Sequence, residues 1–124
     1  MMTEIKTDEE LAAVFSLPKA AIYFQVDWSG PERHARARVR SILSELGNTA
    51  KLFFMECTDQ PEPLLPKWTS LVDEKTLERT RRLFHGGWGG LAFLRSGEVE
   101  EVIAFPMKLE RDQVKEVLSR YCVP

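Results

Sequence analysis

Apolar and polar positions follow two different periods along the chain, and each period predicts one kind of element. Residues 7–16, 29–47 and 109–122 carry apolar side chains at helical spacing. Residues 20–28 and 50–58 are nearly continuous apolar runs, which are typical of buried strands. Residues 91–105 form two shorter runs joined at Ser96-Gly97, which predicts a β-hairpin.

Helix termini are marked by residue pairs that can satisfy unpaired N–H groups. Thr7 stands three positions before Glu10, and Ser29 stands three positions before Glu32. This S/T-x-x-E spacing predicts a capping box, in which the hydroxyl and the carboxylate each accept a bond from the other residue's backbone. Gly47 suits the end of the second helix.

The middle of the chain is less regular. Residues 59–63 read DQPEP, a turn-rich break, and residues 73–84 predict a helix starting near Asp73. Residues 85–90 read HGGWGG, which is too rich in glycine for a regular element. The predicted order is α-β-α-β-α-β-β-α. It favours one α/β domain over residues 1–124, with a mixed central sheet, helices on both faces, and a longer connecting segment around 61–88.

Composition excludes several classes of function. The 124 residues are 44% hydrophobic and 29% charged, which is ordinary for a globular protein. A net charge of -2 gives no support to nucleic-acid binding. The acidic start MMTEIKTDEE does not resemble a signal peptide, and no apolar run is long enough to span a bilayer. We therefore expect a cytoplasmic protein that binds neither nucleic acid nor membrane.

The two cysteines do not form a recognisable metal or redox motif. Cys57 and Cys122 are far apart in the chain, and the two histidines are also scattered. This spacing predicts no zinc site and two buried thiols.

Three segments together resemble the thioredoxin family. In YFQVDWSGPERH, the residues Trp28, Gly30 and Pro31 match the family's active-site segment, where a strand of the type xFWAxW leads into Cys-Gly-Pro-Cys and a long helix. ECTDQPE is similar to the family's third strand and acidic turn, and GGLAFLRSGEVEEV to its hairpin. The resemblance covers nearly the whole chain in the right order, and it implies a thioredoxin-like three-layer fold.

The departures from the family concern its redox chemistry. Ser29 and Glu32 stand at the two cysteine positions, Tyr23 at the buried aspartate, Met55 at the lysine of the third strand, and Gly89 at the cis-proline. Disulfide exchange requires a thiolate that attacks sulfur and a second thiol that releases the mixed disulfide. We therefore expect no disulfide reductase activity, no catalytic residue and no cofactor.

Two interpretations of Ser29 remain. As a helix cap, it would stabilise the fold by about 1 kcal/mol. As an activated nucleophile, it would need a general base, and the reach of His34 to Ser29 is doubtful.

The resemblance also implies a shallow groove for extended peptides. The corresponding residues here are Trp28, Ser29, Gly30, Pro31, Glu32, Trp88 and Gly89, with Phe105 and Pro106 after the hairpin. Because Gly89 replaces the proline, the family's backbone presentation to a peptide need not be retained. Alternatively, one or both tryptophans pack into the core.

Two basic features are further candidates for binding. Arg33, Arg36 and Arg40 form a helical stripe, with Arg38 nearby. The stripe is either a solvated helix face or a site for an acidic segment or a phosphate. Residues 61–85 are longer than the family's counterpart and carry Trp68 and several arginines, so specificity could lie there.

Three functions are consistent with the sequence. The favoured hypothesis is a non-catalytic, chaperone-like module that binds another protein or an extended peptide. The second is a different enzyme on this fold, such as a glutathione-handling transferase that uses Ser29. The third is a purely structural subunit. The oligomeric state is left open.

Overall fold

The computed structural model describes residues 1–58 and 64–124, so the predicted break at 59–63 lies outside the described residues. The elements in chain order are β1 (Met2–Glu4), α1 (Asp8–Phe15), β2 (Lys19–Gln25), α2 (Gly30–Glu45), β3 (Leu52–Glu56), α3 (Leu65–Leu71), α4 (Glu74–His85), β4 (Leu91–Arg95), β5 (Glu98–Ile103), the 3-10 turn η1 (Pro106–Lys108) and α5 (Arg111–Cys122). None of the helices in these two ranges is both long and apolar enough to cross a membrane.

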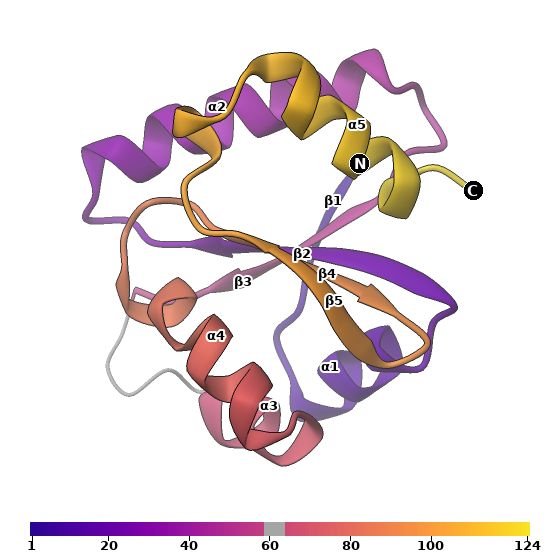
Figure 1. The fold of residues 1–124 in the computed structure, drawn as a ribbon, viewed down its shortest axis with the longest axis vertical. Helices are drawn as coiled ribbons and strands as arrows, with labels where there is room; N and C mark the ends of the chain where they lie inside the picture. The colour runs from indigo at the N-terminus through magenta and orange to yellow at the C-terminus, as the bar shows by residue number, and fades with distance from the viewer. Residues whose placement is uncertain (59–63) are drawn as a thin grey trace.

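A five-stranded mixed sheet forms the middle layer, with the strand order β1-β3-β2-β4-β5. The strands β1, β3 and β2 are parallel, whereas β4 pairs antiparallel with both β2 and β5. Helices α2 and α5 cover one face, and α1, α3 and α4 cover the other (Figure 1). The predicted α/β class with a mixed sheet and helices on both faces is confirmed.

Besides the short 3-10 turn η1, one strand and one helix were not predicted from the sequence. Strand β1 has only three residues and forms by pairing with β3, with Met2 opposite Leu52. Helix α3 has seven residues, and no side chain caps its start at Leu64. Strand β1 is too short to be recognised from its own residues, and the proline in the first turn of α3 is the one local signal of that helix.

The helix starts agree better with the sequence. At α1, Thr7 and Glu10 make both bonds of a capping box. At α4, the Asp73 carboxylate accepts the Thr76 N–H at 2.7 Å. Hydrogen bonding to the side chain and then to the backbone of Thr76 lowers the pKa of Asp73. These local bonds fix where each helix begins.

The core under α1, α3 and α4 is centred on Trp68. Its buried ring meets the rings of Phe15, Phe24 and Phe84 edge-on, with centroids 5.4 to 5.6 Å apart. The indole Nε1–H donates to the Thr80 hydroxyl at 3.0 Å. Trp68 therefore packs α3 and α4 onto the sheet, and it is a core residue of the connecting segment.

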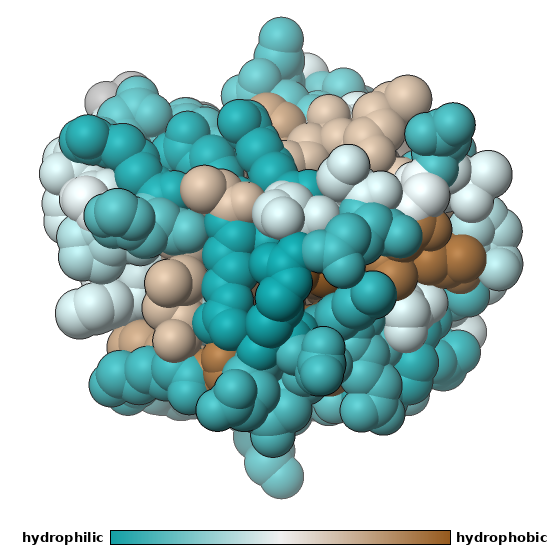
Figure 2. All heavy atoms as spheres, turned by 90° about the horizontal axis from the view of Figure 1, so that it is seen from above, coloured by the Kyte–Doolittle hydropathy of each residue, from teal (hydrophilic) through white to brown (hydrophobic). Residues whose placement is uncertain are grey.

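The opposite core lies under α2 and α5. Val39, Ile42 and Leu118 are fully buried there. The outer surface of these two helices is mostly hydrophilic (Figure 2). The cysteines are divided between the two cores, with Cys57 on the α3 side and Cys122 on the α5 side. Both are buried as predicted, and burial raises the pKa of the Cys122 thiol to about 12.

Thr80→Val tests whether the hydrogen bond from Trp68 stabilises the packing of α3 and α4 on the sheet. Valine keeps the shape of threonine but removes the acceptor, so the buried indole N–H loses its partner. We expect the free energy of unfolding to fall by about 1–3 kcal/mol in urea denaturation. The control Thr69→Val removes an exposed hydroxyl of α3 and should change it by less than about 0.5 kcal/mol. Equal effects of the two variants would contradict the assignment.

Candidate functional site

The turn between β2 and α2 is closed by Ser29. Its side chain is 5% exposed, and its oxygen accepts the backbone N–H of Glu32 at 3.2 Å. The hydroxyl itself donates to the carbonyl of Gly87 at 2.5 Å. The prediction that Ser29 caps α2 is confirmed, and the structure adds a second role: the same hydroxyl joins the helix start to the glycine loop, residues 86–90.

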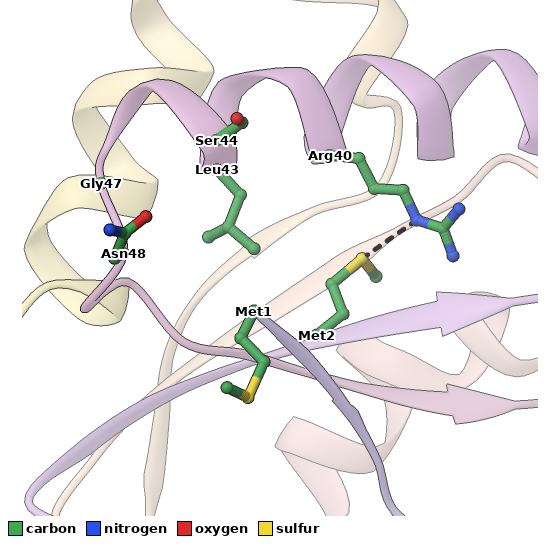
Figure 3. A pocket seen from close by; sticks show the side chains of 7 residues that line it. All are labelled: Met1, Met2, Arg40, Leu43, Ser44, Gly47 and Asn48. Atoms are coloured by element: carbon green, nitrogen blue, oxygen red, sulfur yellow. Dashed lines mark hydrogen bonds between the residues drawn. The ribbon is translucent and has the colours of Figure 1, made fainter.

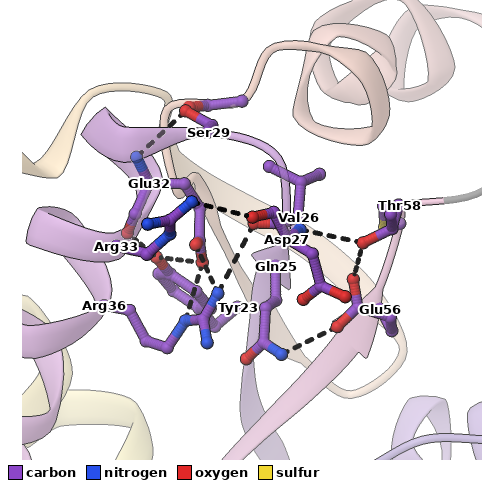
Figure 4. A network of polar contacts seen from close by, with 12 residues as sticks. Tyr23, Gln25, Val26, Asp27, Ser29, Glu32, Arg33, Arg36, Glu56 and Thr58 are labelled. Atoms are coloured by element: carbon purple, nitrogen blue, oxygen red, sulfur yellow. Dashed lines mark hydrogen bonds and ion pairs between the residues drawn. The ribbon is translucent and has the colours of Figure 1, made fainter.

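Glu32 does not complete a capping box, so that prediction is wrong. Its side chain is fully buried, and its carboxylate accepts bonds from the Tyr23 hydroxyl at 3.0 Å and from Arg36 Nε at 3.0 Å and Nη2 at 2.5 Å (Figure 4). Arg36 lies one helical turn after Glu32, so its guanidinium reaches the carboxylate directly. The carboxylate turns inward because a cation and a hydroxyl are both available there.

The charges in this network shift the ionisation of its members. Burial, followed by the negative charge of Glu32, raises the pKa of Tyr23 well above its usual range. The hydrogen bond to Glu32 likewise raises the pKa of Arg36. Tyr23 is therefore a neutral hydrogen-bond donor at physiological pH, and Arg36 is a permanent cation.

A second set of polar contacts joins the ends of β2 and β3. Gln25 Nε2 donates to the Glu56 carboxylate at 2.7 Å, and the Asp27 N–H donates to the Thr58 hydroxyl at 2.9 Å. The Thr58 hydroxyl in turn donates to Glu56. These contacts are visible beside the Glu32 network in Figure 4. They fix the backbone that leads into the turn at Ser29.

The glycine loop lies directly against this turn. Gly87 has φ +68°, and a Cβ there would lie 2.5 Å from the ring atom Cη2 of Trp28. Gly89 has φ +76°, and a Cβ there would overlap the Tyr23 hydroxyl and the Ala35 side chain. Both positions therefore require glycine for conformation and for space. Gly89 was expected beside the turn at Ser29; it packs against Ala35 of α2, and Gly87 is the loop residue that contacts Trp28 and Ser29.

Aromatic side chains are exposed where the loop meets the turn. Trp28 is 60% exposed and its ring covers Gly87, while Trp88 is 48% exposed. Trp88 packs edge-on against Phe105, with ring centroids 5.7 Å apart. The alternative that either tryptophan belongs to the core is thus wrong. We call Trp28, Gly87, Trp88 and Phe105 the tryptophan edge.

The segment after β5 supports one end of this edge. Pro106 is buried, and Arg38 Nη1 donates to the carbonyls of Pro106 and Leu109, each at 2.8 Å. Lys108 Nζ lies 4.6 Å from the centre of the Phe105 ring. Arg38 therefore holds η1 against α2, and it is a structural residue rather than part of a binding stripe.

The structure brings most of the predicted site residues together. Gly30 and Pro31 are exposed at the first turn of α2, next to Trp28. The arginine stripe does not behave as a unit, because Arg36 is committed to Glu32 while Arg33 and Arg40 stay exposed. The sequence analysis named Arg36 and Arg38 only as members of a basic stripe and Tyr23 only at the family's aspartate position, and it did not foresee that they support the turn at Ser29 and the segment after β5. The i,i+4 spacing of Glu32 and Arg36 was an available signal for one of them.

A separate hollow lies near the other end of α2 (Figure 3), with a volume of about 410 Å³. Its lining residues are Met1, Met2, Arg40, Leu43, Ser44, Gly47 and Asn48. Arg40 Nε donates to the sulfur of Met2 at 3.4 Å. Leu43 follows Gly30 by thirteen positions, which is about 20 Å along a helix. The hollow is thus distinct from the tryptophan edge.

The Ser29 hydroxyl at the start of α2 is engaged by the backbone around it. The proton of Ser29 is engaged by the Gly87 carbonyl, and its oxygen is engaged by the Glu32 N–H. Within residues 1–58 and 64–124, no three His, Cys, Asp or Glu side chains gather as metal ligands. The exposed groups include the rings of Trp28 and Trp88, which bind by packing, and charged side chains such as Arg33.

Comparison with known proteins identifies the fold. No family model and no curated protein sequence matches the chain. An asparagine-to-glutamine mutant of a thioredoxin from Halobacterium salinarum is 17% identical, with a TM-score of 0.60 over 99% of this chain and 94% of that one. A cysteine-to-serine mutant of a thioredoxin from Entamoeba histolytica is 14% identical, with a TM-score of 0.59 over 97% of this chain and 99% of that one. The chain therefore has the thioredoxin-like fold.

Arg36→Gln tests whether the buried carboxylate depends on its cation. Glutamine keeps part of the stem but leaves the Glu32 charge without a counter-charge. We expect the free energy of unfolding to fall by about 3–5 kcal/mol. Arg33→Gln removes an exposed arginine from the same turn and serves as the control, with an expected change below about 0.5 kcal/mol. A loss no larger than that of the control would show that Glu32 does not need Arg36.

Proposed function

We propose that this chain is a non-catalytic thioredoxin-fold protein that binds another protein or an extended peptide, in a chaperone-like role, at the tryptophan edge. The observation that carries the proposal is the exposure of Trp28 and Trp88 at the place where the Ser29 hydroxyl is already committed to the fold. Exposed tryptophans with a polar surround are typical of anchors at protein interfaces.

The side chains at the start of α2 and their hydrogen-bond partners support a non-catalytic role. At the two positions where the resembling family has cysteines, this chain has a buried hydroxyl that donates to a carbonyl and a buried carboxylate that is paired. Neither group can attack a disulfide. Cys57 and Cys122 lie in cores on opposite faces of the sheet, so they do not form a dithiol with each other.

The form of the edge supports an extended ligand. Gly30 is exposed, and nothing lies within 4 Å of the place where a Cβ would be, so another backbone can approach closely there. The rings of the edge offer apolar area that loses little side-chain entropy on binding. The strand ends and the start of α2 converge on this edge, which is where ligands dock in open α/β sheets.

We predict that the protein has no disulfide reductase activity. In an assay with a disulfide substrate and excess dithiol, the rate should equal that of the uncatalysed control, because no reactive thiolate stands at the start of α2. A rate above the control that disappears in Cys57→Ser or Cys122→Ser would overturn this prediction.

A further prediction concerns Trp88 as an anchor for a bound peptide. The probe is a set of labelled synthetic peptides with two adjacent apolar residues, measured by fluorescence anisotropy. Trp88→Ala should weaken the tightest of them by at least about fivefold, or 1 kcal/mol. Leu17→Ala, an exposed apolar residue outside this edge, is the control and should leave binding unchanged.

A stability measurement separates anchoring from packing. Trp88→Ala should cost less free energy of unfolding than Phe24→Ala, because Phe24 packs between Trp68 and Phe84 in the core. If Trp88→Ala unfolds the protein as severely as Phe24→Ala, or leaves peptide binding untouched, Trp88 is not an anchor.

A further inference from the structure

We infer that the segment bound at the tryptophan edge is acidic, with carboxylates flanking an apolar anchor residue; this inference rests on the proposed function. The juxtaposition that carries it is a set of three cations around the aromatic rings: Arg33, Arg82 and Lys108.

Each cation is placed at the edge by a contact. Arg33 Nη2 donates to the carbonyl of Asp27, next to Trp28, at 3.3 Å. Arg82 lines the same small hollow as Trp88 and Phe105. Lys108 lies over the Phe105 ring. The three side chains come from α2, α4 and η1, so they approach the rings from different elements.

The carboxylates near these cations are mostly engaged by other groups. Arg82 also lines a hollow with Glu78, Glu100 and Glu101. These three carboxylates form ion pairs with Arg81, Arg95 and Arg120, respectively. The three cations at the edge belong to exposed residues. The Glu32 carboxylate is buried and already neutralised by Arg36, so it does not face a ligand. Asp27 is the exposed carboxylate beside Trp28. The described part of the edge therefore has a local excess of positive charge on a chain whose net charge is -2.

Positive charge at the rim of an apolar patch affects the choice of partner more than the binding affinity. Arginine and lysine at the rim of an apolar patch attract carboxylates, raise the association rate and oppose basic segments. Their effect weakens as salt is added, because the Debye length is about 10 Å at 0.1 M and about 3 Å at 1 M. An acidic segment with one apolar side chain between the rings meets both features of the surface.

The test uses three labelled peptides of equal length with the same apolar pair. The pair is flanked by Glu and Asp in the first peptide, by Gln and Asn in the second, and by Lys in the third. At low ionic strength the acidic peptide should bind the full chain at least about tenfold tighter than the amide peptide, and this preference should shrink at high salt.

Charge reversals locate the effect. Arg33→Glu, Arg82→Glu and Lys108→Glu should each weaken the acidic peptide severalfold and leave the amide peptide nearly unchanged. Lys75→Glu reverses an exposed cation in the first turn of α4, at the opposite end of that helix from Arg82, and should change neither. Circular dichroism of each variant shows that the fold is kept.

The remaining outcomes of the peptide test each overturn one or both proposals. If the amide peptide binds as tightly as the acidic one while Trp88→Ala weakens both, the proposed function stands and the acidic preference is overturned. A preference for the basic peptide, or an acidic preference that survives all three reversals, also overturns it. If no peptide binds, both proposals fail. If sedimentation shows a dimer that the reversals dissociate, the occupant is a second copy of the chain and the inference is wrong.

Discussion

The Glu32 carboxylate lies out of water at the first turn of α2, and a buried carboxylate is tolerated only when it is paired and hydrogen-bonded. Arg36 supplies the charge and Tyr23 supplies a hydroxyl, so the start of α2 is bound both to its own next turn and to the central strand β2. The Tyr23 hydroxyl also fills the space beside Gly89. The Tyr23 hydroxyl thus contacts helix, strand and glycine loop at one point, and the ion pair with Arg36 keeps the Glu32 carboxylate there.

The surface follows from this arrangement. With α2 fixed, Ser29 can reach the Gly87 carbonyl, and the loop is drawn under the ring of Trp28. Trp88 then points out beside Phe105, while Arg38 holds the following turn in place. The groups that stand at the cysteine positions of the resembling family therefore act in folding here, and the proposed binding role belongs to the rings around them.

Local sequence signals predicted the fold well. Alternating strands and helices, the caps at Thr7 and Asp73, and the hairpin at Ser96-Gly97 are encoded within a few residues, and all appear in the structure. The same signals could not show β1 or α3, which depend on partners distant in the chain. The sequence also placed Trp68 and Trp88 in one connecting segment, although the first is core and the second is exposed.

The sequence predicted which segments form the site, but it did not predict their hydrogen-bond partners. Resemblance to the family brought Trp28, Ser29 and Gly89 together. In the structure, Trp28 and Ser29 contact Gly87 of the same loop, whereas Gly89 lies against Tyr23 and Ala35. The capping-box spacing suggested that Glu32 turns back to Ser29, yet the carboxylate turns inward to Tyr23 and Arg36. A local pattern cannot reveal this choice, because it depends on which side chains the sheet places below the helix.

The most direct test of the account is the stability of Ser29→Ala. If Ser29 is a structural link, losing the cap and the bond to Gly87 should lower the free energy of unfolding by about 1–3 kcal/mol in urea. Ser29→Thr, which keeps a hydroxyl, should recover part of that loss. Ser44→Ala, an exposed serine in the same helix, is the control and should change stability by less than about 0.5 kcal/mol. A Ser29→Ala variant as stable as this control would contradict the account.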